Sequence, residues 1–171
     1  MARLEIITYP NPLLNEKAAP VEKFDDKLSQ FIDDMVQTMY EGNGIGLAAP
    51  QVSVLKRLIV VDVSPEQKSP MHFVNPEIIE SSGRVKFEEG CLSVPDYRDT
   101  VTRAAQITVR AKDRSGKTFE LQADGLLAKV TATADFAALK DCQLVIEAVF
   151  ENREVKAEAT KKAEAALPAD A

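Results

Sequence analysis

Residues 44–51 read GIGLAAPQ, and residues 88–93, about forty positions later, read EEGCLS. In the first stretch two glycines follow a segment with helical periodicity, and a proline comes directly before Gln51. Glycine allows the backbone to turn tightly or to approach another chain closely. In the second stretch Cys91 follows two carboxylates and a glycine. The predictions of fold and site below start from these two stretches.

The composition is typical of one globular domain. The chain has 171 residues, 45% hydrophobic content and a formal net charge of −6, so it can bury one core but offers no basic surface to polyanions. No apolar run approaches the roughly 18–20 residues of a transmembrane helix, and the first residues do not resemble a signal peptide. Two cysteines, Cys91 and Cys142, make no disulfide framework. We expect a cytoplasmic protein without a membrane or direct nucleic-acid partner.

Apolar spacing predicts one long helix before the first stretch. Between residues 25 and 39 apolar side chains recur every three or four positions, and residues 41–44 (EGNG) end the pattern. Strands are predicted at residues 4–8, 56–63, 73–76, 85–88, 100–111 and 118–123. A turn at residues 113–116 (DRSG) joins the last two in a hairpin. The pattern predicts the α+β class, with antiparallel strands around a helix.

The pattern changes near residues 125–128 (GLLA). Farther on, residues 144–149 form an apolar strand-like run, and the Ala-, Glu- and Lys-rich residues 152–167 are predicted to be helical. A helix–strand–helix segment of this size has difficulty burying its own apolar strand. We therefore predict a domain at residues 1–128 and, at residues 129–171, a segment that is not an independent domain.

The spacing of Gly44, Gly46 and Ala49 permits a second interpretation, a dinucleotide-binding fingerprint. That fingerprint requires a strand before it and a helix directly after it. Here a predicted helix precedes the glycines, and Pro50 interrupts the segment that follows. A simple glycine turn between a helix and a strand remains an alternative.

Together the two stretches resemble the first two signature motifs of the peptide deformylases, metal-dependent hydrolases that remove the formyl group from nascent polypeptides. The resemblance implies a deformylase-like fold for residues 1–128, and N-formylmethionyl peptides or nascent chains as partners. It also implies that the Gln51 side chain and the Leu92 backbone N–H hold the oxyanion that develops in the reaction.

The same resemblance assigns the remaining site residues. Cys91 corresponds to a metal ligand, and Ile45, Gly46 and Arg98 correspond to substrate-binding positions. The implied cofactor is Fe(II) or another divalent metal, because thiolate and imidazole ligands suit such ions.

The third signature motif of that family, a helical His-Glu-x-x-His sequence, has no counterpart here. Residues 123–128 (ADGLLA) match the segment that leads into it. Aligned without gaps, its two histidines fall on Thr133 and Ala137, and its glutamate on Ala134. These side chains cannot replace two imidazole ligands and a general base. We therefore expect hydrolysis to be lost or nearly lost.

Residues 129–136 (KVTATADF) and 144–152 (LVIEAVFEN) instead resemble part of the NAD-binding domain of 3-hydroxyacyl-CoA dehydrogenases. This fragment lacks that family's glycine fingerprint and catalytic histidine, so it implies no dehydrogenase activity. A fusion near residue 128, with a replaced C-terminal region, is expected. A non-catalytic peptide-binding module and a non-functional hybrid chain remain the alternative functions.

Four other residues are candidate metal ligands. His72, the only histidine of the chain, is expected to be a neutral, structural side chain at a strand edge. Glu88 and Glu89 offer oxygen ligands or a substitute base, but an acidic pair beside a turn is usually solvated. Cys142 lies in the foreign segment and is the weakest of the candidates.

Overall fold

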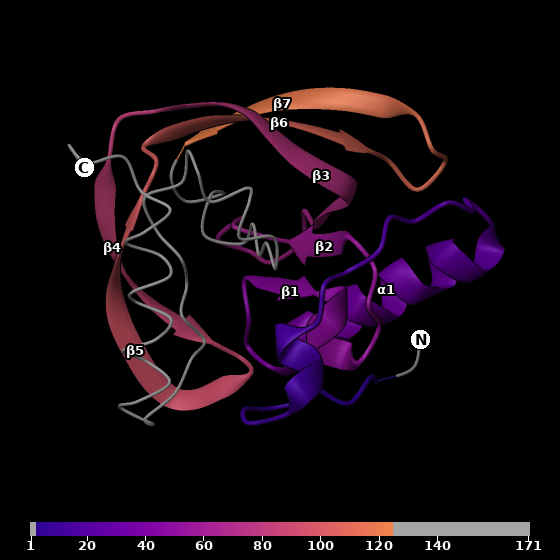
Figure 1. The fold of residues 1–171 in the computed structure, drawn as a ribbon, viewed down its shortest axis with the longest axis horizontal. Helices are drawn as coiled ribbons and strands as arrows, with labels where there is room; N and C mark the ends of the chain where they lie inside the picture. The colour runs from indigo at the N-terminus through magenta and orange to yellow at the C-terminus, as the bar shows by residue number, and fades with distance from the viewer. Residues whose placement is uncertain (1–2, 125–171) are drawn as a thin grey trace.

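The computed structural model describes residues 3–124, which fold around two antiparallel sheets and one helix (Figure 1). The larger sheet has the strand order β1-β2-β3-β6-β7, and β4 and β5 pair separately. The bounds are α1 Asp26–Glu41, β1 Gly46–Ala48, β2 Leu58–Val61, β3 Met71–Ser82, β4 Val85–Cys91, β5 Val94–Arg103, β6 Gln106–Lys112 and β7 Thr118–Asp124, with short 3-10 helices η1 Pro12–Asn15 and η2 Ala49–Val52. The predicted α+β class is confirmed.

The helix α1 begins and ends close to its predicted bounds. Asp25 caps it, because its side chain accepts the N–H of Leu28 at 3.0 Å and so satisfies a donor of the first turn. On the inner face Ile32, Met35 and Met39 are fully buried. This face packs on β1 and β2, as Figure 1 shows. The apolar side chains whose spacing predicted the helix therefore form its buried face.

The strand β2 lies between two hydrophobic clusters. Leu58 and Val60 belong to the cluster that contains the buried face of α1, whereas Ile59 and Val61 belong to a second cluster with Phe73. Successive side chains of a strand point to opposite faces, so one buried strand serves both cores. The prediction of a buried strand is confirmed, with the narrower bounds Leu58–Val61.

The predicted single strand at residues 100–111 is wrong. The chain leaves the smaller sheet at Arg103 and enters the larger sheet at Gln106, so the segment is divided between β5 and β6. Both halves have strand-like composition, and only their pairing with β4 and with β3 separates them. The hairpin of β6 and β7 is confirmed, and the Asp113 side chain accepts two backbone N–H groups in its turn.

The predicted strand at residues 4–8 is also wrong. This segment is extended but pairs with no strand among residues 3–124. The Leu4 N–H donates to Thr38 Oγ1 at 2.9 Å, and the Ile7 N–H donates to the Gln51 carbonyl at 2.9 Å. Its partners are a helix side chain and a 3-10 helix, so no ladder forms. The segment instead ties α1 to η2.

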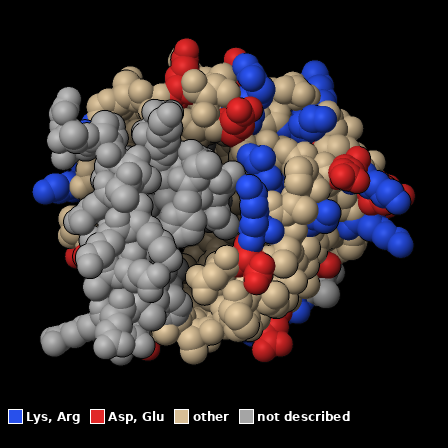
Figure 2. Space-filling view, viewed as in Figure 1, with Lys and Arg blue, Asp and Glu red and all other residues tan. Residues whose placement is uncertain are grey.

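Charged side chains of both signs are mixed on the described part of the face that Figure 2 draws. Figure 2 shows Lys and Arg side chains beside Asp and Glu side chains on the described part of this face. Within residues 3–124 no helix is long and apolar enough to cross a membrane. The segment predicted at residues 129–171 lies outside the described residues.

Candidate functional site

The side chain of Gln51 joins residues 44–51 to residues 88–93. Gln51 lies in η2, directly after β1, and its Oε1 accepts the N–H of Ala48 at 2.9 Å. Its Nε2 lies 3.1 Å from Ser93 Oγ and 3.8 Å from Cys91 Sγ. The structure therefore brings Gln51 and Cys91, both singled out from the sequence, into one site.

A tight turn presents the second stretch to Gln51. Cys91 ends β4 and pairs with Val94 of β5, so Leu92 and Ser93 alone form the turn. Ser93 is only 2% exposed, and its carbonyl accepts the N–H of Tyr9 at 2.9 Å. Sequence reasoning gave Ser93 no role. Its place in the motif beside Cys91 was the signal available.

Leu92 occupies a space that two glycines leave open. A Cβ added to Gly44 would lie 2.7 Å from Leu92 Cδ1, and one added to Gly42 would lie 3.3 Å from Leu92 Cδ2. The first of these distances is shorter than real Cβ contacts, so an alanine at position 44 would require Leu92 to move. Gly44 thus has a packing role, because it lets the turn of the second stretch lie against the end of α1.

The predicted substrate-binding residues lie at the surface. Ile45 is 40% exposed, and Gly46 begins β1 at the edge of the larger sheet. Arg98 lies across the strand pair from Gly90, and its side chain is 72% exposed and 3.5 Å from Glu88. Ile45 and Gly46 lead along β1 towards Gln51, whereas Arg98 is engaged in an ion pair on the smaller sheet.

Glu89 is not the solvated carboxylate that the sequence suggested. Its two oxygens accept from Arg103 Nε at 3.1 Å and Nη2 at 2.7 Å, and the side chains are only 11% and 8% exposed. Such a bidentate ion pair is strong and geometrically specific. It joins β4 to β5 two residues before Cys91. The partner lies fourteen positions away, so the local sequence could not reveal it.

The residues present do not fit a metal held by one thiolate and two imidazoles. The only histidine, His72, lies in β3, and its Nε2 accepts the N–H of Arg114 at 3.2 Å. Glu89 is committed to Arg103. Within the described part of the chain, no three His, Cys, Asp or Glu side chains gather as a metal-ligand group. The positions that align with the missing ligands and base lie beyond residue 124, as does Cys142.

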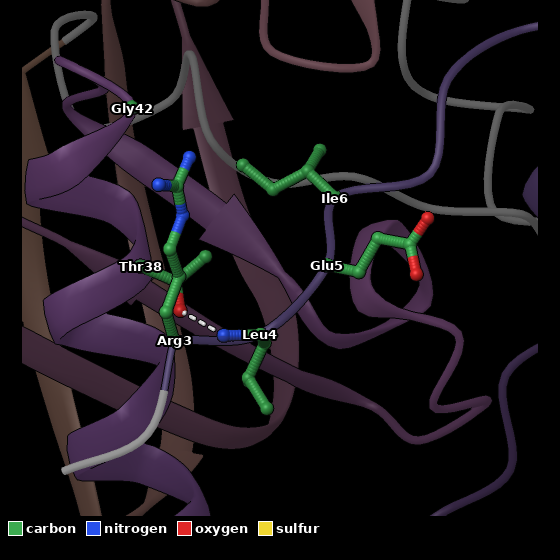
Figure 3. A pocket seen from close by; sticks show the side chains of 6 residues that line it. All are labelled: Arg3, Leu4, Glu5, Ile6, Thr38 and Gly42. Carbon is green, nitrogen blue, oxygen red and sulfur yellow. Dashed lines mark hydrogen bonds between the residues drawn. The ribbon is translucent and has the colours of Figure 1, made fainter.

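A pocket of about 440 Å³ lies elsewhere, where the N-terminal segment crosses α1 (Figure 3). Its lining residues are Arg3, Leu4, Glu5, Ile6, Thr38 and Gly42. Inside it the Leu4 N–H donates to Thr38 Oγ1. Arg3, which also lines it, pairs with Glu41 at 3.3 Å. These contacts fasten the N-terminal segment to the helix, and none of the predicted site residues lines the pocket.

The family model, the curated relatives and the solved structures that match this chain all point to one family. A family model described as polypeptide deformylase matches residues 3–133, which include every described residue. A peptide deformylase of Chromobacterium violaceum is 56% identical over 128 residues, or 75% of this chain and 77% of that protein. One of Tolumonas auensis is 52% identical over 128 residues, with the same two coverages of 75% and 77%.

Solved structures show the same similarity. A peptide deformylase from Legionella pneumophila superposes with a TM-score of 0.72 at 50% identity, covering 75% of this chain and 76% of that one. A peptide deformylase from Synechococcus elongatus, solved in complex with actinonin, gives a TM-score of 0.71 at 41% identity and covers 74% and 70%.

Proposed function

Because this chain belongs to the polypeptide deformylase family, we propose that it carries a deformylase-type site for N-formylmethionyl peptides in which hydrolysis is lost or nearly lost. The observation that supports this site is the meeting of Gln51 Nε2 with Ser93 Oγ at 3.1 Å and Cys91 Sγ at 3.8 Å. The Gln51 amide and the Leu92 backbone N–H are donors of the kind that hold a carbonyl oxygen or an oxyanion. Ile45, Gly46 and Arg98 are the proposed substrate-binding residues.

The proposed loss of hydrolysis follows from the donor set. By resemblance, the intact family uses Fe(II) or another divalent metal, and Cys91 is the single member of that ligand set retained here. His72 has a structural partner in Arg114. Ala134, at the position of the general base, cannot move a proton, and such a base typically contributes about 10²–10⁴-fold to the rate.

The proposal includes a replaced C-terminal region. Residues 129–171 carry the dehydrogenase-like stretches, and the two relatives described above align over 128 residues, 75% of this chain. The family model ends at residue 133, five positions past the predicted junction at residue 128. The matched segment thus ends near the proposed junction at about residue 128.

A non-catalytic peptide-binding module is the second candidate. One observation favours it: β1 is an edge strand of the larger sheet and begins beside the exposed side chain of Ile45. An edge strand can pair with an extended peptide through its main chain, and neighbouring side chains then supply selectivity. This function needs no metal ligand. Nascent chains in the cytoplasm would be its partners.

Hydrolysis of formyl-Met-Ala-Ser by the purified full chain tests the proposal. The assay is run anaerobically with Fe(II) or Ni(II), beside an active intact relative and the Cys91→Ala variant. We expect the unaltered chain to hydrolyse the peptide no faster than the Cys91→Ala variant does. Turnover that Cys91→Ala abolishes would show that other residues rebuild the site and would overturn the proposed loss. Two further measurements separate the alternatives if there is no turnover.

Binding of the same peptide to the purified chain would support the second candidate. A broad thermal melt, together with binding of a dye to exposed apolar surface, would instead indicate a hybrid chain without function.

A further inference from the structure

The orientation of the Gln51 side-chain amide is determined by its neighbours. A glutamine amide has one acceptor oxygen and a nitrogen with two N–H donors. The Ala48 N–H occupies the oxygen at 2.9 Å. A flipped amide would bring its NH₂ group against this backbone donor, with two donors facing each other. The observed orientation therefore directs Nε2 towards Ser93 and Cys91.

The two N–H donors of Gln51 have acceptors of different quality. Ser93 Oγ, 3.1 Å away, is a good acceptor in a nearly fully buried residue. Cys91 Sγ, 3.8 Å away, is a weak acceptor at long range. One N–H is thus committed to Ser93, while the other can exchange its sulfur contact for a carbonyl oxygen.

The backbone of Ser93 is itself held in place. Ser93 lies in the two-residue turn between β4 and β5, and its carbonyl accepts the Tyr9 N–H at 2.9 Å. The Gln51 carbonyl accepts the Ile7 N–H at 2.9 Å, so the same N-terminal segment anchors both residues. Neither backbone can shift easily to compensate for a lost side-chain contact.

We propose that Ser93 is a positioning residue for Gln51, whose buried hydroxyl aims the second side-chain N–H of Gln51 at the carbonyl oxygen of a bound formyl group. The identity of that oxygen rests on the proposed function. The hydrogen bond between Ser93 and Gln51 does not, and it is tested separately.

Hydrogen exchange of the Gln51 side-chain amide, followed by NMR in the full chain, tests the hydrogen bond without any ligand. The resonance is assigned from its loss in Gln51→Leu. We expect exchange about tenfold slower than for the exposed Gln122, the protection that one buried hydrogen bond provides. Ser93→Ala should remove this protection, and Ser93→Thr, which keeps the hydroxyl, should restore it. An unprotected Gln51 amide in the unaltered chain would overturn the proposal.

Peptide selectivity then tests the positioning role. The dissociation constants of formyl-Met-Ala-Ser and Met-Ala-Ser are compared in a double-mutant cycle of Ser93→Ala and Gln51→Ala. We expect each variant to reduce the preference for the formylated peptide about fivefold, and the double variant to reduce it no further. An equal Ser93→Ala effect in the Gln51→Ala background would mean that Ser93 acts structurally, which would overturn the positioning role. If neither peptide binds, the proposed function fails together with this role, whereas amide exchange still decides whether Ser93 holds Gln51.

Discussion

At the scale of single residues, Gly44 is a position where residues 44–51 and residues 88–93 constrain each other, through Leu92. The sequence suggested that the glycine lets a peptide approach the backbone. The structure adds a requirement within the fold, because a Cβ at this position would lie 2.7 Å from Leu92 Cδ1. A methyl group here must displace the leucine whose backbone N–H belongs to the proposed site.

We therefore expect Gly44→Ala to lower the free energy of unfolding by about 1 kcal/mol, because Leu92 must rotate or the turn must shift. Urea denaturation measures this change, and the methyl resonances of Leu92 should move. Gly90→Ala is the matched control, because a Cβ there meets its nearest atoms at an ordinary 3.7 Å. Equal effects of the two substitutions would contradict the packing role of Gly44.

At the scale of elements, the hairpin of β6 and β7 is fastened to the domain at its turn. The Arg114 N–H donates to His72 Nε2 in β3 at 3.2 Å, and Arg114 Nη2 lies 2.9 Å from Asp33 Oδ1 in α1. Burial, followed by the charge of Arg114, lowers the pKa of His72, although Asp113 and Asp33 oppose this change. The imidazole therefore acts as a neutral acceptor, consistent with the structural role expected for it.

This contact predicts a loss of stability in mild acid. The unfolded chain protonates its histidine near pH 6.5, above the lowered pKa of the folded state, so the unfolded state binds the proton more readily. The free energy of unfolding should fall as the pH decreases from about 6.5 through the folded pKa, and then level off. His72→Gln keeps an acceptor and does not titrate, so it should lack this component. Urea denaturation from pH 7.5 to 4.5 compares the two proteins, and identical pH profiles would disprove the assignment.

The smaller sheet depends on the buried pair of Glu89 and Arg103. We expect Arg103→Met to lower the free energy of unfolding by about 3 kcal/mol, because it leaves a carboxylate buried without its partner. Arg110→Met is the matched control: Arg110 pairs with Glu120 at 2.9 Å, but these side chains are 49% and 52% exposed. Exposed pairs contribute at most about 1 kcal/mol.

A second variant separates charge from packing in that pair. Replacing Glu89 by Leu together with Arg103→Met removes both charges, and should recover most of the stability lost in the single variant. Thermal melts of the two single variants and of the double variant measure this recovery. A double variant as unstable as Arg103→Met would show that lost packing, and not the unpaired charge, causes the effect.

At the scale of the whole molecule, the retained scaffold and the missing ligands lead to opposite expectations for binding. The proposed peptide contacts would use β1, η2 and the turn after β4, all of which lie among the described residues. A tightly bound metal requires several convergent donors, and the imidazoles of the family's set have no counterparts in this sequence. We therefore expect this chain to retain peptide binding and to lose tight metal binding.

The metal content of the purified chain tests the expected loss of metal binding. After dialysis against Zn(II), or anaerobically against Fe(II), elemental analysis should find well below one equivalent per chain, because a lone thiolate with displaceable partners does not hold such ions tightly. Cys91→Ser should leave this value unchanged. One equivalent in the unaltered chain, lost in the Cys91→Ser variant, would show that residues elsewhere complete a site around this thiolate.

The sequence by itself determined the family, the amphipathic helix, the hairpin of β6 and β7 and the shortage of imidazole ligands. These features are local, because apolar periodicity, turn residues and motif composition are present along short pieces of chain. Tertiary structure alone decided that Gln51 meets Ser93, that Leu92 lies over Gly44 and that Arg103 neutralises Glu89. It also divided residues 100–111 between two sheets. Each of these outcomes depends on which distant segments pack together, and no local pattern records the pairing of strands or the burial of a charge.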